Sequence, residues 1–137
     1  MRTTYRKKTQ GQALVEFTLV IGIFLTLMMG LICVGQLLLA NYTVSQAARA
    51  AAHQAAIAGG DATAAQAAAT QVLDAGVGTT ATEAQVVVTC ERRPCRRYDP
   101  ITVTVAYRGA FWTPLPPLFT AFALEARATR AAERDQQ

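Results

Sequence analysis

Residue types that carry enzyme chemistry are scarce in this chain of 137 residues. Histidine occurs once, at position 53, and the nine acidic residues are scattered instead of paired. The sequence contains no nucleophile elbow, no glycine-rich phosphate loop and no metal-binding signature. It therefore predicts a protein that is not an enzyme and takes no cofactor, metal or small-molecule substrate. A membrane-tethered enzyme that depends on His53 is the weakest alternative.

Basic residues are not in excess beyond the first ten positions. Arg2, Arg6, Lys7 and Lys8 precede Gly11 without an acid among them, and the other 126 residues carry nine basic and nine acidic side chains. Because no basic patch with interleaved aromatic residues remains, the composition argues against nucleic-acid binding. A basic tail beside an apolar segment instead holds the N-terminus in the cytoplasm and sends the rest outward.

Charge is absent from Phe17 to Ala40. Of these 24 residues, 14 are Leu, Ile, Val or Phe, which favour insertion into a membrane by about 4 to 8 kcal/mol. About 20 such residues are enough to cross a bilayer as a helix, so we expect a transmembrane helix at about 17–40. A secretory signal peptide is the alternative, but its apolar core is usually only about 7–15 residues long.

The stretch "KKTQGQALVEF" (7–17) places a single carboxylate, Glu16, ahead of this apolar run. A glycine, a glutamate five residues later, an aromatic residue and then the membrane helix resemble a prepilin processing site. The resemblance implies cleavage between Gly11 and Gln12 by a membrane prepilin peptidase on the cytoplasmic side. Glu16, followed by Phe17, would then lie at the favourable end of the helix dipole and pair with the new ammonium of Gln12 or of a neighbour. The alternative is a hydrated interfacial Glu16 without a role.

The sequence from Gly11 to about Ala56 is similar to the TadE-like family, the minor pseudopilins of tight-adherence pilus systems. Family members run from G-x-A-x-V-E-F through an apolar helix to a polar, aromatic-containing turn and then "AAR", here Asn41, Tyr42 and 47–49. "ITVTVAYRGAFWTPLPPLF" and "ALEARATRAAE" resemble later parts of the family. An acidic residue often follows the arginine in the family, whereas Ala50 follows Arg49 here.

The resemblance implies a minor pseudopilin that acts by assembly through its helix and an outer head. Its implied partners are the membrane, the prepilin peptidase, other pilins or pseudopilins, and an inner-membrane assembly platform with a secretion ATPase. It implies a single-pass protein of the cytoplasmic (inner) membrane that is cut, with the N-terminus in the cytoplasm and the bulk outside. Incorporation into an extracellular pilus and retention in the assembly platform are both open. The alternative is an uncut single-pass scaffold subunit of an envelope or secretion complex.

The remaining sequence predicts an α+β fold. A long helix is expected at about 12–58, ended by Gly59 and Gly60, and a second helix at 61–75 capped by Asp61. Strands are expected at 84–90 and 101–107, and the last alternating segment, 122–129, is expected to be a third strand although a helix fits nearly as well. A breaker-rich connection occupies 113–119. The expected parts are a leader (1–11), the long helix (12–58) and an extracytoplasmic head (59–137).

Small residues recur every four positions in the apolar run, at Thr18, Gly22, Thr26 and Gly30. Such a stripe lets membrane helices approach closely. Ordinary membrane-helix composition explains it equally well.

Cys90 and Cys95 bracket the loop "ERRP" between the first two expected strands. Outside the cytoplasm, a disulfide that closes this hairpin is expected, because a zinc site needs two more ligands. Arginines 92, 93, 96 and 97 crowd the same loop. They form either a solvated loop tip or a patch that binds a partner.

Overall fold

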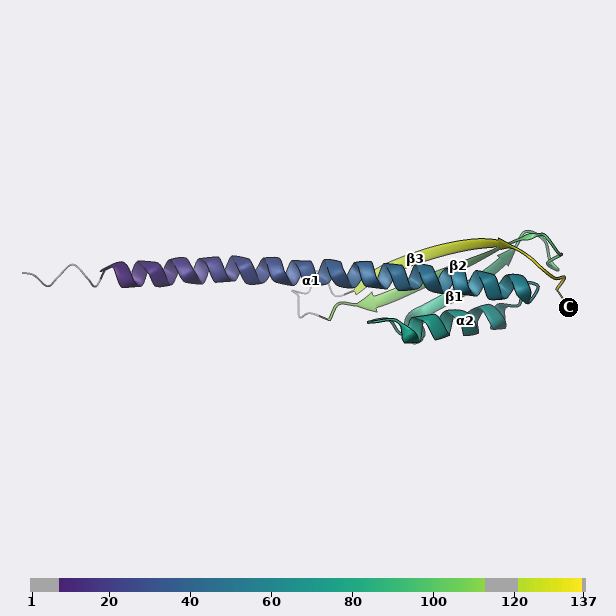
Figure 1. Cartoon of the computed structure of the whole chain (residues 1–137), viewed down its shortest axis with the longest axis horizontal. Helices are drawn as coiled ribbons and strands as arrows, with labels where there is room; N and C mark the ends of the chain where they lie inside the picture. The colour runs from purple at the N-terminus through teal and green to yellow at the C-terminus, as the bar shows by residue number, and fades with distance from the viewer. Residues whose placement is uncertain (1–7, 113–120, 137) are drawn as a thin grey trace, which may run out of the picture. The chain divides into compact units, whose positions relative to one another are not determined.

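The computed structural model describes residues 8–112 and 121–136, and the described part is an α+β protein (Figure 1). Its elements are α1 (Lys8–Ile57), α2 (Ala62–Ala75), the short 3₁₀ helix η1 (Ala81–Glu83), and strands β1 (Ala84–Cys90), β2 (Pro100–Ala110) and β3 (Ala121–Ala131). The expected fold class is confirmed, with a long N-terminal helix, a second helix and a three-stranded antiparallel sheet. The expected connection at 113–119 and the basic residues before Lys8 lie outside the described residues.

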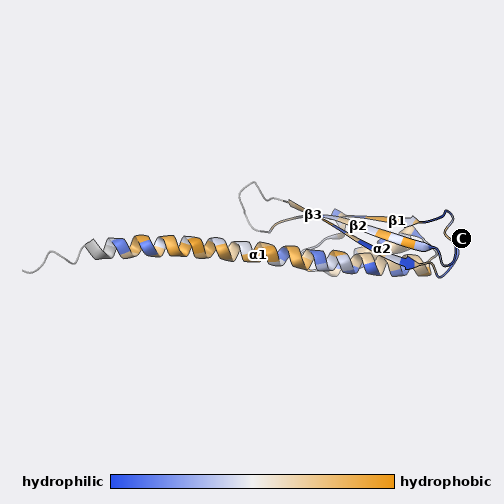
Figure 2. Cartoon of the chain, turned by 90° about the horizontal axis from the view of Figure 1, so that it is seen from above, coloured by the Kyte–Doolittle hydropathy of each residue, from blue (hydrophilic) through white to orange (hydrophobic). Residues whose placement is uncertain are grey.

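The chain divides into two compact units, residues 1–35 and 36–137, with the boundary inside α1. In the described part of the first unit, nearly every residue from Gly11 to Gly35 is exposed, although most of the side chains are large and apolar. Figure 2 shows the corresponding apolar colour along this part of α1. The helix is long and apolar enough to cross a membrane.

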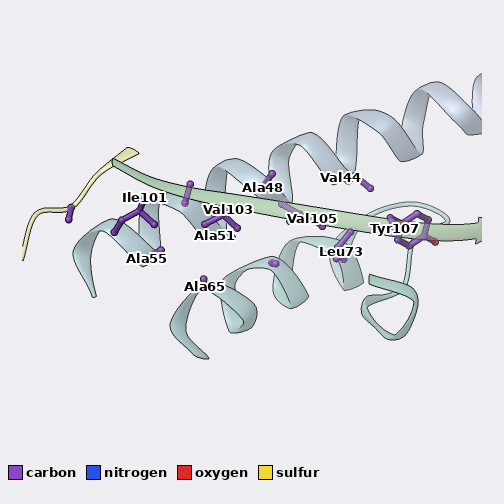
Figure 3. Close-up of a cluster of buried hydrophobic side chains, with 14 residues drawn as sticks. Val44, Ala48, Ala51, Ala55, Ala65, Leu73, Ile101, Val103, Val105 and Tyr107 are labelled. Carbon is purple, nitrogen blue, oxygen red and sulfur yellow. The ribbon is translucent and has the colours of Figure 1, made fainter. Parts of the chain in front are cut away.

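The second unit, which we call the head, is built around one core. α1 contributes a face of small residues, which are Val44, Ala47, Ala48, Ala51, Ala52 and Ala55. They recur at intervals of three and four residues, as one buried face of a helix requires. Ala65, Ala69 and Leu73 of α2, alternate residues of β2, and Ala132 after β3 complete the cluster. Figure 3 shows these side chains between the two helices and β2.

The sheet has the strand order β1-β2-β3, and both pairings are antiparallel. Ile101, Val103, Val105 and Tyr107 of β2 are buried, whereas the intervening residues are not. The predicted alternation is therefore confirmed, and β1 has its predicted bounds. β2 is longer than predicted because it pairs with β3 over eleven residues, from Pro100 opposite Ala131 to Ala110 opposite Ala121. The last segment is the predicted strand instead of a helix.

Two glycines end α1 where the sequence predicts. Gly59 and Gly60 have φ angles of 66° and 90°, the left-handed conformation that glycine adopts at low cost. The amide of Gly60 donates to the carbonyl of Ala55 at 2.7 Å, which closes the helix end. Asp61 then caps α2, as predicted, by accepting a hydrogen bond from the amide of Thr63 at 3.0 Å.

The beginning of α1 differs from the prediction. The helix was expected to begin at about Gln12, but it begins at Lys8 and continues through Gly11. No proline or capping residue separates residues 8–11 from the apolar run. Although one glycine weakens a helix by about 1 kcal/mol relative to alanine, the strong helix formers after it sustain the helical conformation.

Candidate assembly site

The residues of the predicted processing site lie together on α1. Gly11, Gln12, Glu16 and Phe17 are all exposed. Gln12 and Glu16 are four residues apart in the helix and therefore lie on the same face, one turn apart. Among residues 11–112 and 121–136, no hydrogen bond or ion pair involves the side chain of Glu16. A Cβ atom at Gly11 would meet no atom within 4 Å, so a larger side chain fits there in the isolated chain.

The small-residue stripe follows directly along α1. The hydroxyls of Thr18 and Thr26 donate to the carbonyls of Leu14 and Gly22 at 2.8 and 2.9 Å. These hydroxyls are therefore satisfied within their own helix, as a lipid environment requires. A shallow apolar groove is lined by Thr18, Leu19, Gly22, Ile23, Thr26 and Leu27. A Cβ atom at Gly22 or Gly30 would meet nothing within 4 Å, so both positions are open to a neighbouring helix.

One end of the head is closed by the Cys90–Cys95 disulfide, whose Cα atoms are 5.8 Å apart. The bond packs against the end of α1, because a Cβ atom at Gly60 would overlap with the Sγ atom of Cys95. The C-terminal segment joins the same structure through Gln136, whose amide donates to the carbonyl of Cys95 at 2.9 Å. The amide of Cys95 in turn donates to Oε1 of Gln136 at 3.1 Å.

The arginines of this loop are exposed, and nearby acids bind the backbone instead of the guanidinium groups. The amide of Arg96 donates to Asp99 at 3.1 Å, and the amide of Arg97 donates to Asp135 at 2.7 Å. The guanidinium of Arg97 lies 4.9 Å from the ring centroid of Tyr98. Within the described residues, the one ion pair joins Arg127 and Glu125 on the exposed face of β3.

Gln36 is a structural residue that the sequence analysis missed. It is buried, with 5% of its surface exposed. Its Nε2 donates to the carbonyl of Ala110 at 2.9 Å, and its Oε1 accepts from the amide of Trp112 at 3.2 Å. Both ends of one amide thereby hold the end of β2 against α1. The sequence offered one sign of this role, because Gln36 is a lone amide inside the apolar run. Its partners could not be predicted, since they are 74 and 76 residues away in the sequence.

Two titratable groups of the head have shifted pKa values. Tyr107 is buried in the core, and its hydroxyl donates to Glu83 at 3.0 Å. Burial, followed by this hydrogen bond and the charge of Glu83, raises the pKa of Tyr107 above its ordinary value of 10.0. The exposed Asp61 has a lowered pKa because the hydroxyl and amide of Thr63 donate to its carboxylate.

The single histidine does not lie in a catalytic arrangement. His53 is exposed on α1. In the part of the chain that the structure describes, no three His, Cys, Asp or Glu side chains are close enough together to hold a metal ion.

An apolar helix that crosses a membrane, continued into an α+β head, defines a single-pass membrane protein. The family model described as TadE-like protein matches residues 11–53, from the predicted cleavage position through the apolar run to His53. The resemblance to this family is thereby confirmed over that segment, and it relates the chain to tight-adherence pilus systems.

The match does not extend to the sheet. β1, β2 and β3 all lie after residue 53, so the two later segments that resemble the family stay a prediction. No curated protein and no solved structure matches the chain.

Proposed function

We propose that this protein is a minor pseudopilin of a tight-adherence pilus or secretion system. The observation that carries the proposal is the TadE-like match, which begins at Gly11 and includes Glu16 and the whole apolar run. The ten residues before Gly11, with their basic side chains, fall outside the match. This is the division that a removable leader followed by a mature membrane helix would produce.

The first step of the proposed function is cleavage between Gly11 and Gln12 by a prepilin peptidase on the cytoplasmic side. Since α1 passes through this bond, the peptidase must first unwind the helix locally. Gly11 lowers the cost of unwinding by about 1 kcal/mol relative to alanine, and it leaves room for the peptidase to approach the backbone. Cleavage also removes four basic residues without removing an acid.

The new N-terminus then gives Glu16 a partner. The ammonium of Gln12 would lie one helical turn from the Glu16 carboxylate, or beside that of a neighbouring subunit. A carboxylate without a partner costs about 2.5–3.5 kcal/mol at the centre of a bilayer and less near its surface. Pairing between subunits would therefore favour assembly. The open stripe at Thr18, Gly22, Thr26 and Gly30 supplies the face on which neighbouring helices approach.

The proposed function also places the head outside the cytoplasm, with the N-terminus inside. There the head would contact other pilins or pseudopilins and the inner-membrane assembly platform. The disulfide between Cys90 and Cys95 supports this orientation, because such bonds persist in oxidising compartments. In this proposal the protein performs no chemistry of its own.

Leader cleavage is tested by Gly11→Val in cells that contain the prepilin peptidase. We expect the wild-type protein to begin at Gln12 and the variant to keep its leader, because a branched side chain blocks the approach to the scissile bond. The measurement is the intact mass of the purified protein. Gly35→Val is the matched control, since a Cβ atom there also meets nothing within 4 Å, and it should be cut normally.

A Gly11→Val chain that begins at Gln12 would contradict the role of Gly11. A wild-type chain that still carries residues 1–11 would overturn the cleavage itself. The protein would then be the second candidate, an uncut single-pass scaffold subunit. That candidate is favoured by the unbroken course of α1 through Gly11.

A further inference from the structure

The apolar run of α1 continues into the head. The run covers 24 residues, from Phe17 to Ala40, whereas the head begins at Gln36. Residues 17–35 form a helix of about 28 Å, close to the hydrocarbon thickness of about 30 Å. The last residues of the run are therefore not needed to cross the membrane, although they are as apolar as the rest.

Gln36 is the first residue of the head. From this residue onward α1 is in contact with polar backbone of the head, through the bonds of Gln36 to Ala110 and Trp112. The end of a strand at Ala110, followed by irregular backbone at 111–112, is not tolerated among lipid tails. The chain therefore leaves the hydrocarbon layer at about Gln36 and passes into the interfacial layer.

Large apolar side chains remain exposed at this end of the head. We call them the apolar rim, and its members are Leu38, Leu39, Tyr42, Val77 and Trp112. Each is more than half exposed. A soluble surface seldom exposes several such residues together without a partner.

Contacts within the head bring the rim together. A Cβ atom at Gly76 would overlap with the side chain of Thr43, next to Tyr42. A Cβ atom at Gly78 would overlap with the ring of Trp112. Val77 lies between these two glycines, of which Gly76 contacts α1 and Gly78 contacts Trp112. Gln36 in turn binds the backbone of Trp112 and so holds it to α1.

We propose that the apolar rim lies in the interfacial layer of the membrane, with the indole of Trp112 as its anchor. Tryptophan and tyrosine favour this layer because their rings are apolar and each carries one polar group. The rim directly continues the membrane-crossing run, so the lipid surface is the partner that reaches it first. This inference rests on the single-pass topology and holds whether or not the leader is removed.

The chain offers a direct probe, because Trp112 is its only tryptophan. The full-length protein is reconstituted into phosphatidylcholine vesicles whose acyl chains carry bromine either near the headgroup or near the chain end. We expect shallow bromines to quench Trp112 more strongly than deep ones. We also expect acrylamide in the outer solution to quench it weakly.

A matched control moves the tryptophan to the other end of the head. In the double variant Trp112→Phe/Tyr98→Trp, the indole replaces an exposed residue of the β1–β2 connection, three residues after the disulfide. That loop packs at Gly60, which is 24 residues or about 36 Å along the chain from Gln36. The control indole should be quenched by acrylamide and by neither bromolipid.

Three results would overturn the proposal. Acrylamide quenching of Trp112 as strong as in the control would place the ring in water. Stronger quenching by deep bromines would place it among the lipid tails. Protection from acrylamide without bromine quenching would show that protein covers the rim.

Discussion

The two halves of α1 have the same helical backbone but differ in their side chains. The first half exposes large side chains, and the second half buries small ones. From Gly11 to Gly35 the helix carries large aliphatic side chains, and nearly all of them are exposed. From Gln36 to Ile57 its buried residues are mostly alanines. The first half is suited to lipid, which accepts bulky side chains without specific packing. The second half is suited to the head, because small side chains let α1 approach α2 and the sheet closely.

The comparison is tested most strongly by the same substitution in each half. Val44→Ala removes two methyl groups from a fully buried position, and we expect it to lower the unfolding free energy of the head by about 2–3 kcal/mol. Val34→Ala, ten residues earlier, alters an exposed side chain and should change that free energy by less than about 0.5 kcal/mol. The measurement is denaturant unfolding of the full chain in detergent micelles, followed by Trp112 fluorescence. Equal effects of the two substitutions would contradict the comparison.

The boundary between the halves is tested by Gln36→Leu. This change keeps the size of the side chain but removes its amide, which leaves the carbonyl of Ala110 and the amide of Trp112 without their partner. We expect a loss of about 1–2 kcal/mol in unfolding free energy, measured as for Val44→Ala. Gln54→Leu is the control, since Gln54 is exposed on the same helix. If Gln36→Leu is as stable as the control, the amide contributes no net stability.

The smallest effect is expected from pH. Because the folded-state pKa of Tyr107 is raised above 10.0, the folded head holds this proton more tightly than the unfolded chain does. The resulting stability is fully present below pH 10 and is lost as the pH rises from there through the folded-state pKa. Tyr107→Phe should reduce this alkaline loss, as measured by denaturant midpoints between pH 9 and 11. An unchanged pH dependence in the variant would assign the loss to other groups.

The fold followed from local patterns to a large extent. Alternation of β-branched residues predicts β1 and the buried face of β2, and Gly59 with Gly60 predicts the end of α1. These signals are local, because each depends only on the residues of one helix or strand and on which of its faces is buried. The start of α1 was wrong by four residues, since nothing in residues 8–11 opposes a helix strongly enough to end it.

The candidate site was less predictable. The processing site at Gly11, Glu16 and Phe17 stays a prediction, and it needs only the sequence because the spacing of these residues is itself the motif. Gln36 and the Tyr107–Glu83 pair were not, because hydrogen bonds between distant segments depend on how the sheet docks on α1. The rim was missed for the same reason, since Val77 and Trp112 join α1 only in the folded head.

The alanine-lined seam between α1 and the rest of the head has a mechanical consequence. Alanine has no rotamers to exchange, so the contact cannot relax by reshuffling side chains when a force acts on it. Residues 36–57 of α1 and the sheet would then move together as one rigid body. A force that turns this part of α1 would therefore turn the sheet with it.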